Sequence, residues 1–207
     1  MRDLRPEPLI FPQGVRFCRP DELPKGLEGE ESRIAEARLT TGYVVWDSEK
    51  DAFRAQFGAN VHAPEIWDVF QDLVRALLPE IAAPIVGVKD DDPILGPYTD
   101  RDRALAAFAP FADSLQHDGL LEFGMIFQHR GRTEEVFVKA AKYLQIWTNE
   151  PELARAVLER HGIPEVPDLK FIHQYPRVSQ TLSFGEIAGW STVISLLQAA
   201  FDALPRR

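Results

Sequence analysis

The sequence predicts a single α+β domain, with a mixed or mainly antiparallel sheet that contains a long central hairpin and is packed by about four helices. The main observation is the stretch Leu120–Tyr175, where apolar residues recur in several runs at every second position, as in strands. Before and after it, apolar residues recur at the three- and four-residue spacing of amphipathic helices. The expected order is β, α, β, α, β, β, α, β, α, and its two consecutive strands argue against a strictly parallel doubly wound sheet.

The N-terminal residues 1–38 are rich in proline and in charged side chains. Proline interrupts helices and removes a hydrogen-bond donor from strands. We therefore expect an extended arm that packs on a domain formed by residues 39–207. Within the arm, segments 9–11 and 15–17 suit short edge strands, and the acidic segment 26–38 has room for one helical turn.

The first part of the domain contains a strand, a strong helix and a second strand. Residues Leu39–Asp47 read as a strand and Gly58–Ala63 as a loop. The helix begins near Pro64, which suits a first turn, and ends before Pro79. Its apolar residues share one face: Ile66, Trp67, Phe70, Leu73, Val74, Leu77 and Leu78. Residues Ala83–Val88 then read as a short buried strand.

The next helix has a capping signal and an internal break. Thr99 and Asp102 have the spacing at which a first-turn side chain caps a helix. Four apolar residues align behind them: Leu105, Phe108, Ala112 and Leu115. Pro110 should kink or split this helix, because proline lacks the N–H and collides with the preceding turn.

The hairpin joins a strand at Leu121–His129 to a returning strand at Glu134–Thr148. The returning strand is longer than most, so we expect a bulge near Ala140 and Ala141. Its alternation assigns Val136, Val138, Ala140, Leu144 and Ile146 to one face and Phe137, Lys139, Tyr143, Gln145 and Trp147 to the other.

Two helices and one strand complete the expected fold. Asn149 should cap a helix that ends at Gly162, with Leu153, Val157 and Leu158 facing inward. Residues Leu169–Tyr175 alternate as a strand. Ser183 and Glu186 form a capping box for the last helix, whose apolar stripe is Ile187, Trp190, Ile194, Leu197, Phe201 and Leu204.

Composition and charge limit the function classes. Hydrophobic residues make up 45% of the chain and charged residues 27%, as in ordinary globular proteins. The formal net charge is −9, from 32 acidic and 23 basic side chains. Because binding to a phosphate backbone requires a basic surface, nucleic acid is not expected as a partner. A basic protein partner complements this charge better.

The chain has one cysteine, Cys18. An internal disulfide and a cysteine-rich zinc site are therefore excluded, and a reducing compartment fits best. The N-terminus lacks the apolar core of a signal peptide, and no run approaches the roughly 18 apolar residues of a membrane helix. We expect a cytoplasmic protein with no membrane contact.

The usual signatures of chemistry are absent. Asp90, Asp91 and Asp92 lack the spacing of a calcium loop and read as a solvated acidic loop, so no metal and no cofactor are expected. The chain contains no nucleophile elbow and no phosphate-binding loop. His117 precedes Asp118 at a helix end, where the helix dipole favours a charged histidine.

Acid–base catalysis needs only two well-placed side chains, so weak candidates remain. His173 is the best of them, because it shares a strand face with Phe171 and Tyr175, where desolvation would lower its pKa. The alternative is a hydrogen-bonded histidine at the edge of the core, which we favour. Glu122 is a second candidate, and a cross-strand salt bridge to Lys139 accounts for it without catalysis.

Two surfaces are candidates for partner binding. On the hairpin, Tyr143 and Trp147 project beside Lys139, as amphipathic anchors do at protein interfaces. The competing interpretation is a sheet covered by helices on both faces, with these aromatics in the core. The second surface is the loop from Lys89 to Tyr98, where Asp90, Asp91 and Asp92 precede apolar residues.

A small acidic chain with one cysteine and no catalytic signature resembles the immunity proteins that neutralise bacterial toxins. The residues that prompt this resemblance are the segment Phe137–Ser179 and the acidic loop Asp90–Asp92. The resemblance implies a non-catalytic acidic protein that inhibits a basic toxin domain in a stoichiometric complex. One alternative is a small-molecule enzyme with a dispersed site near His173, Glu122, Tyr143 and Asp118. Another is an assembly or adaptor subunit, and the oligomeric state stays open.

Overall fold

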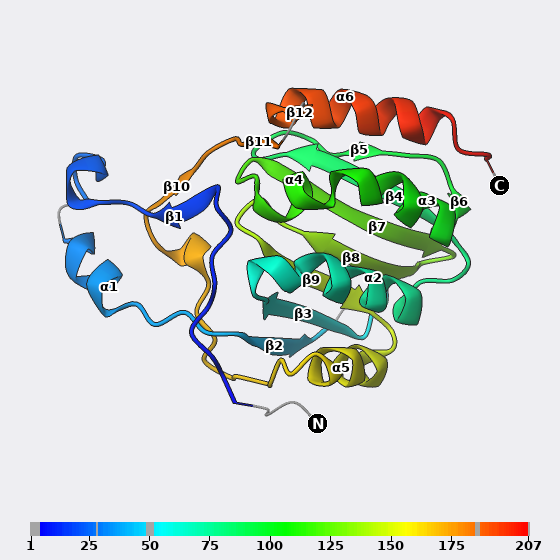
Figure 1. Cartoon of the computed structure of the whole chain (residues 1–207). Coiled ribbons are helices and arrows are strands. Elements are labelled where there is room, and N and C mark those ends of the chain that lie inside the picture. The colour runs from blue at the N-terminus through cyan, green and yellow to red at the C-terminus, as the bar shows by residue number, and fades with distance from the viewer. Residues whose placement is uncertain (1–4, 28, 49–51, 185–186, 207) are drawn as a thin grey trace.

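The computed structural model describes residues 5–27, 29–48, 52–184 and 187–206, and it has the α+β architecture expected from the sequence (Figure 1). An antiparallel eight-stranded sheet forms the centre, in the order β2-β3-β9-β8-β7-β4-β5, with β6 also paired to β4. Its strands are β2 Gly42–Asp47, β3 Ala55–Asn60, β4 Ile81–Val88, β5 Ile94–Leu95, β6 Thr99–Asp100, β7 Leu121–His129, β8 Arg132–Val138 and β9 Tyr143–Thr148.

The helices pack on one face of this sheet, the face turned toward the viewer in Figure 1. They are α2 Ile66–Leu77, α3 Arg101–Phe108, α4 Ala112–His117, α5 Pro151–Arg160 and α6 Gly189–Asp202. α2 crosses the middle, α5 lies beside β2 and α6 lies along the β4 edge (Figure 1). The main hydrophobic core fills the space between this layer and the sheet, with Phe70, Phe108 and Phe123 in mutual ring contact.

The helix signals around two prolines are confirmed. α2 ends at Leu77, before Pro79, and its predicted apolar face is buried apart from Trp67, which is half-buried. At Pro110 the next helix is split as predicted: α3 and α4 are separated by the 3₁₀ turn Ala109–Phe111. A proline inside a helical pattern interrupts the backbone hydrogen-bond ladder, which explains the turn.

Three strands of the sheet were not predicted: β3, and the two short strands β5 and β6, which lie where a loop and a helix cap were expected. β3 covers Ala55–Asn60, so the loop expected at Gly58–Ala63 is wrong in its first half. β3 has no β-branched residue, which is why its sequence does not read as a strand. Its inward positions are nevertheless apolar, and Phe57 and Ala59 are fully buried.

The prediction of one long returning strand at Glu134–Thr148 is also wrong. The chain forms two strands, β8 and β9, joined by a tight turn through Ala140 and Ala141 in place of a bulge. The turn closes by hydrogen bonds from the N–H of Lys142 to Lys139 and of Lys139 to Tyr143. The face assignment survives because Val138 pairs with Leu144, so residues of equal parity stay on one side.

Two predicted helix caps are incorrect. Asp100, and not Thr99 with Asp102, caps α3 by accepting a hydrogen bond from the N–H of Arg103 at 2.9 Å. Asn149 does not cap α5; its side-chain amide instead donates to the carbonyls of Ala52 and Thr133. At Asn149, hydrogen bonds to residues distant in sequence replace local capping, whereas at α3 the cap is local but lies one residue after Thr99. Leu153, expected to face inward, is 47% exposed, whereas Val157 and Leu158 are buried.

The segment Leu169–Tyr175 is not a strand. It is extended chain ending in the 3₁₀ turn Ile172–Gln174, and it lies against one end of the sheet. The chain then forms β10, Arg177–Ser179, which pairs with β1, Val15–Phe17. The N-terminal segment also contains α1, Glu30–Glu36.

The last helix has the predicted stripe except for Ile187, which lies in β12, Ile187–Ala188, before the helix begins at Gly189. Ile194, Leu197 and Phe201 are buried, and Trp190 and Leu204 pack beside them. Ser183 lies in β11, Ser183–Phe184, which pairs with β12. Glu186, its predicted capping partner, lies outside the described residues. In the part of the chain that the structure describes, no helix combines the length and the apolar character needed to cross a membrane.

Candidate functional site

The face of the sheet opposite the helices is the main candidate site. The strand register aligns Trp46, Gln56, Trp147, Glu135 and Ile126 across five strands on this face. All five side chains are exposed or half-buried, whereas their sequence neighbours on the helical side, such as Val136 and Ile146, are fully buried. We call the side carrying this row the open face.

Two glycines allow aromatic rings to lie on the open face. A Cβ at Gly58 would lie 2.9 Å from Phe171 and 3.2 Å from Trp46, and one at Gly124 would lie 2.5 Å from Phe137. The rings therefore occupy the space that side chains at these positions would fill. The open face is consequently partly aromatic above these glycines.

One end of the open face carries a cluster of polar groups. Glu122 accepts hydrogen bonds from Nζ of Lys139 at 2.8 Å and from the N–H of Ala140 at 3.0 Å. The predicted cross-strand salt bridge is therefore confirmed. Together with Lys89, Asp90, Asp91, Tyr143, His173 and Arg177, this ion pair lines a hollow of about 410 Å³, which we call the polar pocket.

His173 and Tyr143 form one wall of the polar pocket. Their rings are 4.7 Å apart, and Phe171 stacks on His173 at 5.5 Å. Partial burial lowers the pKa of His173, and the charge of Arg177 adds to this effect. Burial raises the pKa of Tyr143. The wall is therefore aromatic, with a neutral imidazole near pH 7.

This arrangement lacks the features of an acid–base dyad. Glu122 is committed to Lys139 and to a backbone N–H, so it does not orient His173. Among the described residues, no side chain forms a hydrogen bond with the partly buried imidazole of His173. Consequently, no described side chain orients the His173 ring or fixes its tautomer.

A smaller hollow of about 190 Å³ lies on the other side of the Tyr143–His173 wall. It is lined by Trp46, Gln56, Gln145, Leu169, Phe171 and Gln174, among others. Because the two hollows share Tyr143 and His173, they form one surface, which extends from the exposed Trp46 to the acidic loop at Asp90.

The other sequence candidates lie elsewhere or have structural roles. Asp118 is 1% exposed and accepts hydrogen bonds from the N–H groups of Leu120 and Leu182 and from the Thr181 hydroxyl, so it cannot act in the polar pocket. Burial lowers the pKa of His117, the opposite of the helix-end expectation. Asp92 is exposed outside the polar pocket.

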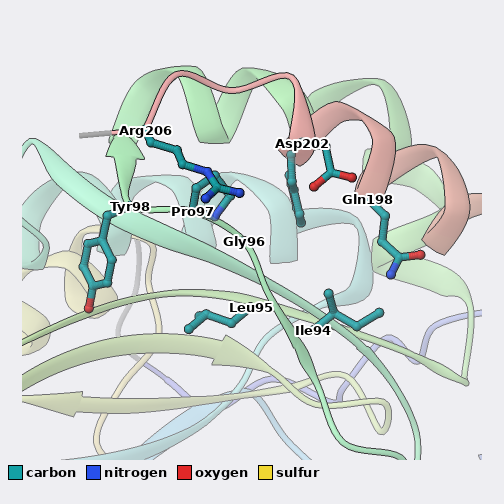
Figure 2. A pocket seen from close by; sticks show the side chains of 9 residues that line it. Ile94, Leu95, Gly96, Pro97, Tyr98, Gln198, Asp202 and Arg206 are labelled. Atoms are coloured by element: carbon teal, nitrogen blue, oxygen red, sulfur yellow. The ribbon is translucent and has the colours of Figure 1, made fainter.

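Tyr98 belongs to a separate cleft of about 470 Å³ between the β5–β6 connection and the C-terminal end of α6. Figure 2 shows Gln198, Asp202 and Arg206 of this end facing the chain from Ile94 to Tyr98. The Tyr98 hydroxyl donates to the carbonyl of Gln128 and accepts from its N–H, so it is engaged within the fold.

Of the row on the open face, only Trp147 was a candidate from the sequence, and the most informative omissions are Trp46 and Glu135. Trp46 is 48% exposed and lies in the same row as Trp147. Glu135 lies between Trp147 and Ile126. Strand alternation contained the signal for both, because each is next to an inward-facing residue of its own strand.

The residues that the structure describes contain no cluster of histidine, cysteine or acidic side chains able to hold a metal ion. Comparison with protein-family models, with curated proteins and with solved structures finds no match to this chain.

Proposed function

We propose that this chain is a non-catalytic binding protein that uses the open face of its sheet to hold a protein partner. The observation that carries the proposal is the row of half-exposed aromatic, amide and acidic side chains on a sheet face that the helices leave uncovered. Tyrosine and tryptophan on such a surface supply large contact area with little loss of conformational freedom.

The dimensions of the open face suit this role. Six neighbouring strands, β2 to β4 in the sheet order, lie about 4.8 Å apart and are each roughly 20 Å long, which gives an area on the order of 600 Å². A stable complex buries about 800 Å² on each partner. The acidic loop and the segment around His173 border the open face and can supply the remainder.

Within this class, an immunity protein that inhibits a toxin by stoichiometric binding agrees best with the charge. With a net charge of −9, the chain attracts a basic partner and accelerates its capture. Inhibition then needs no chemistry from the bound chain, only coverage of the toxin's active site or of a neighbouring surface.

The test is complex formation with the product of the adjacent gene, measured by calorimetry and by rescue of cells that express that product. Trp46→Ala and Trp147→Ala should each weaken the complex by at least about tenfold. Leu153→Ala and Leu196→Ala are the matched controls, because both residues are exposed apolar side chains on the helical side. Equal effects of all four substitutions, or no complex at all, would contradict the proposal.

The second candidate is a small-molecule enzyme, favoured by the convergence of His173, Tyr143 and Glu122 in the polar pocket. If it is correct, His173→Ala abolishes turnover of a substrate found by screening and leaves folding intact. The third candidate, an assembly subunit, requires the purified chain to self-associate in a way that Trp147→Ala weakens.

A further inference from the structure

Glu135 places a carboxylate at the middle of the open face. It lies on β8 directly between Trp147 of β9 and Ile126 of β7. Phe137, two positions further along β8, faces the same side. The Glu135 side chain is therefore half-buried between apolar and aromatic neighbours.

This carboxylate is not neutralised within the fold. Among the described residues, none forms a hydrogen bond or an ion pair with Glu135. Lys139, whose charge acts on it, is held 2.8 Å from Glu122 and 5.1 Å from the centre of the Phe137 ring. Burial raises the pKa of Glu135 to about 7, against the opposing effect of Lys139. A partly buried carboxylate that accepts no hydrogen bond is stabilised strongly when a cation from another molecule donates hydrogen bonds to it.

We propose that Glu135, with the half-exposed Trp147 beside it, is the socket for an arginine side chain of the protein partner, an inference that rests on the proposed function. A guanidinium group donates two parallel hydrogen bonds to a carboxylate and stacks on aromatic rings. It is also less strongly hydrated than an ammonium group, so lysine fits this half-apolar position less well. The partner residue is accordingly an exposed arginine on a basic surface.

The experiment titrates the whole chain with the peptide acetyl-Gly-Arg-Gly-amide, up to about 50 mM, and follows the Trp147 indole and Glu135 carboxyl signals by NMR. The expected result is saturable shifts of both signals and at least tenfold weaker binding of the peptide that contains neutral citrulline. Glu135→Gln should lose the binding, whereas Glu152→Gln, which removes the same charge from an exposed site on α5, should retain it. Equal binding of both peptides, unchanged affinity of Glu135→Gln, or no shift in the whole range overturns the socket.

The two proposals fail separately. If the complex with the adjacent gene product forms and depends on Trp147, but the peptide does not bind, the arginine socket is wrong and the binding face stands. If the peptide binds through Glu135 but no partner complex depends on Trp46 or Trp147, the proposed function is wrong and the socket stands as a cation site.

Discussion

Replacement of Lys142 by methionine should change how the stability of this protein depends on pH. Lys142 lies in the β8–β9 turn and is 3% exposed. Its Nζ donates to the carbonyl of Leu121 at 2.6 Å and lies 6.0 Å from the centre of the Phe123 ring. Its backbone has a φ of 57°, which a methionine would share, so the substitution alters the buried amine and not the backbone strain.

The magnitude follows from the pKa of this amine. Burial lowers the pKa of Lys142 from 10.5 to about 7, although the charges of Asp118 and Glu122 oppose the change. Because the unfolded chain holds the proton of Lys142 more tightly, the contribution of this group to stability is lowest below pH 7 and rises as the pH increases from about 7 toward 10.5. Between pH 6 and pH 9 this single group should add about 2–3 kcal/mol to the free energy of unfolding.

The assay is urea unfolding of both proteins at several pH values from 6 to 9, followed by circular dichroism. From pH 6 to pH 9, the free energy of unfolding of Lys142→Met should rise by about 2–3 kcal/mol less than that of the wild type. At pH 6, Lys142→Met should be the more stable of the two proteins. Lys170→Met, at an exposed lysine, is the control and should follow the wild type. Parallel curves for Lys142→Met and the wild type would refute the reasoning.

Three further predictions concern the sheet. Glu135→Gln should stabilise the protein at pH 8 but not at pH 4. Burial raises the pKa of Glu135 from 4.5 to about 7, so the stabilisation that the protonated carboxyl contributes is lost as the pH rises through this range. Equal urea-unfolding midpoints of the variant and the wild type at pH 8 would count against this. Glu134→Ala should cost about 1–3 kcal/mol in urea unfolding, since this buried carboxylate accepts hydrogen bonds at the end of β9; a loss below about 0.5 kcal/mol would contradict it. Gly124→Ala should lower the free energy of unfolding by about 1–3 kcal/mol, because the new Cβ would meet the Phe137 ring at 2.5 Å. Gly29→Ala is the control and should change the melting temperature little, because the space around Gly29 is open. Similar melting temperatures for the two variants would argue against the close contact.

The candidate site was partly predictable from sequence. Alternation placed Tyr143, Gln145 and Trp147 on one side of β9, and the observed burial agrees. The salt bridge between Glu122 and Lys139 was also predicted. Local alternation assigns a residue to one of two faces of its own strand, however, and does not say which strands become neighbours. Trp46 and Glu135 joined the site only through pairing across β3 and β9.

The sequence alone determined the properties that depend on short-range spacing and on composition. These are the α+β class, the burial pattern of α2, the break at Pro110 and the net charge of −9. Each follows from the periods of helix and strand or from counting residues.

Only the tertiary structure decided which face of the sheet the helices cover. That choice is global, because it depends on how all the apolar helix faces pack together on the sheet. The packing of the helices left Trp46, Trp147 and Glu135 on the open face. Tertiary contacts also placed His173 beside Tyr143, in a 3₁₀ turn, although the alternation of the segment Leu169–Tyr175 had predicted a strand. Contacts between residues far apart in the chain form this surface, and for that reason the alternation within single strands placed residues on a face but did not bring the strands together.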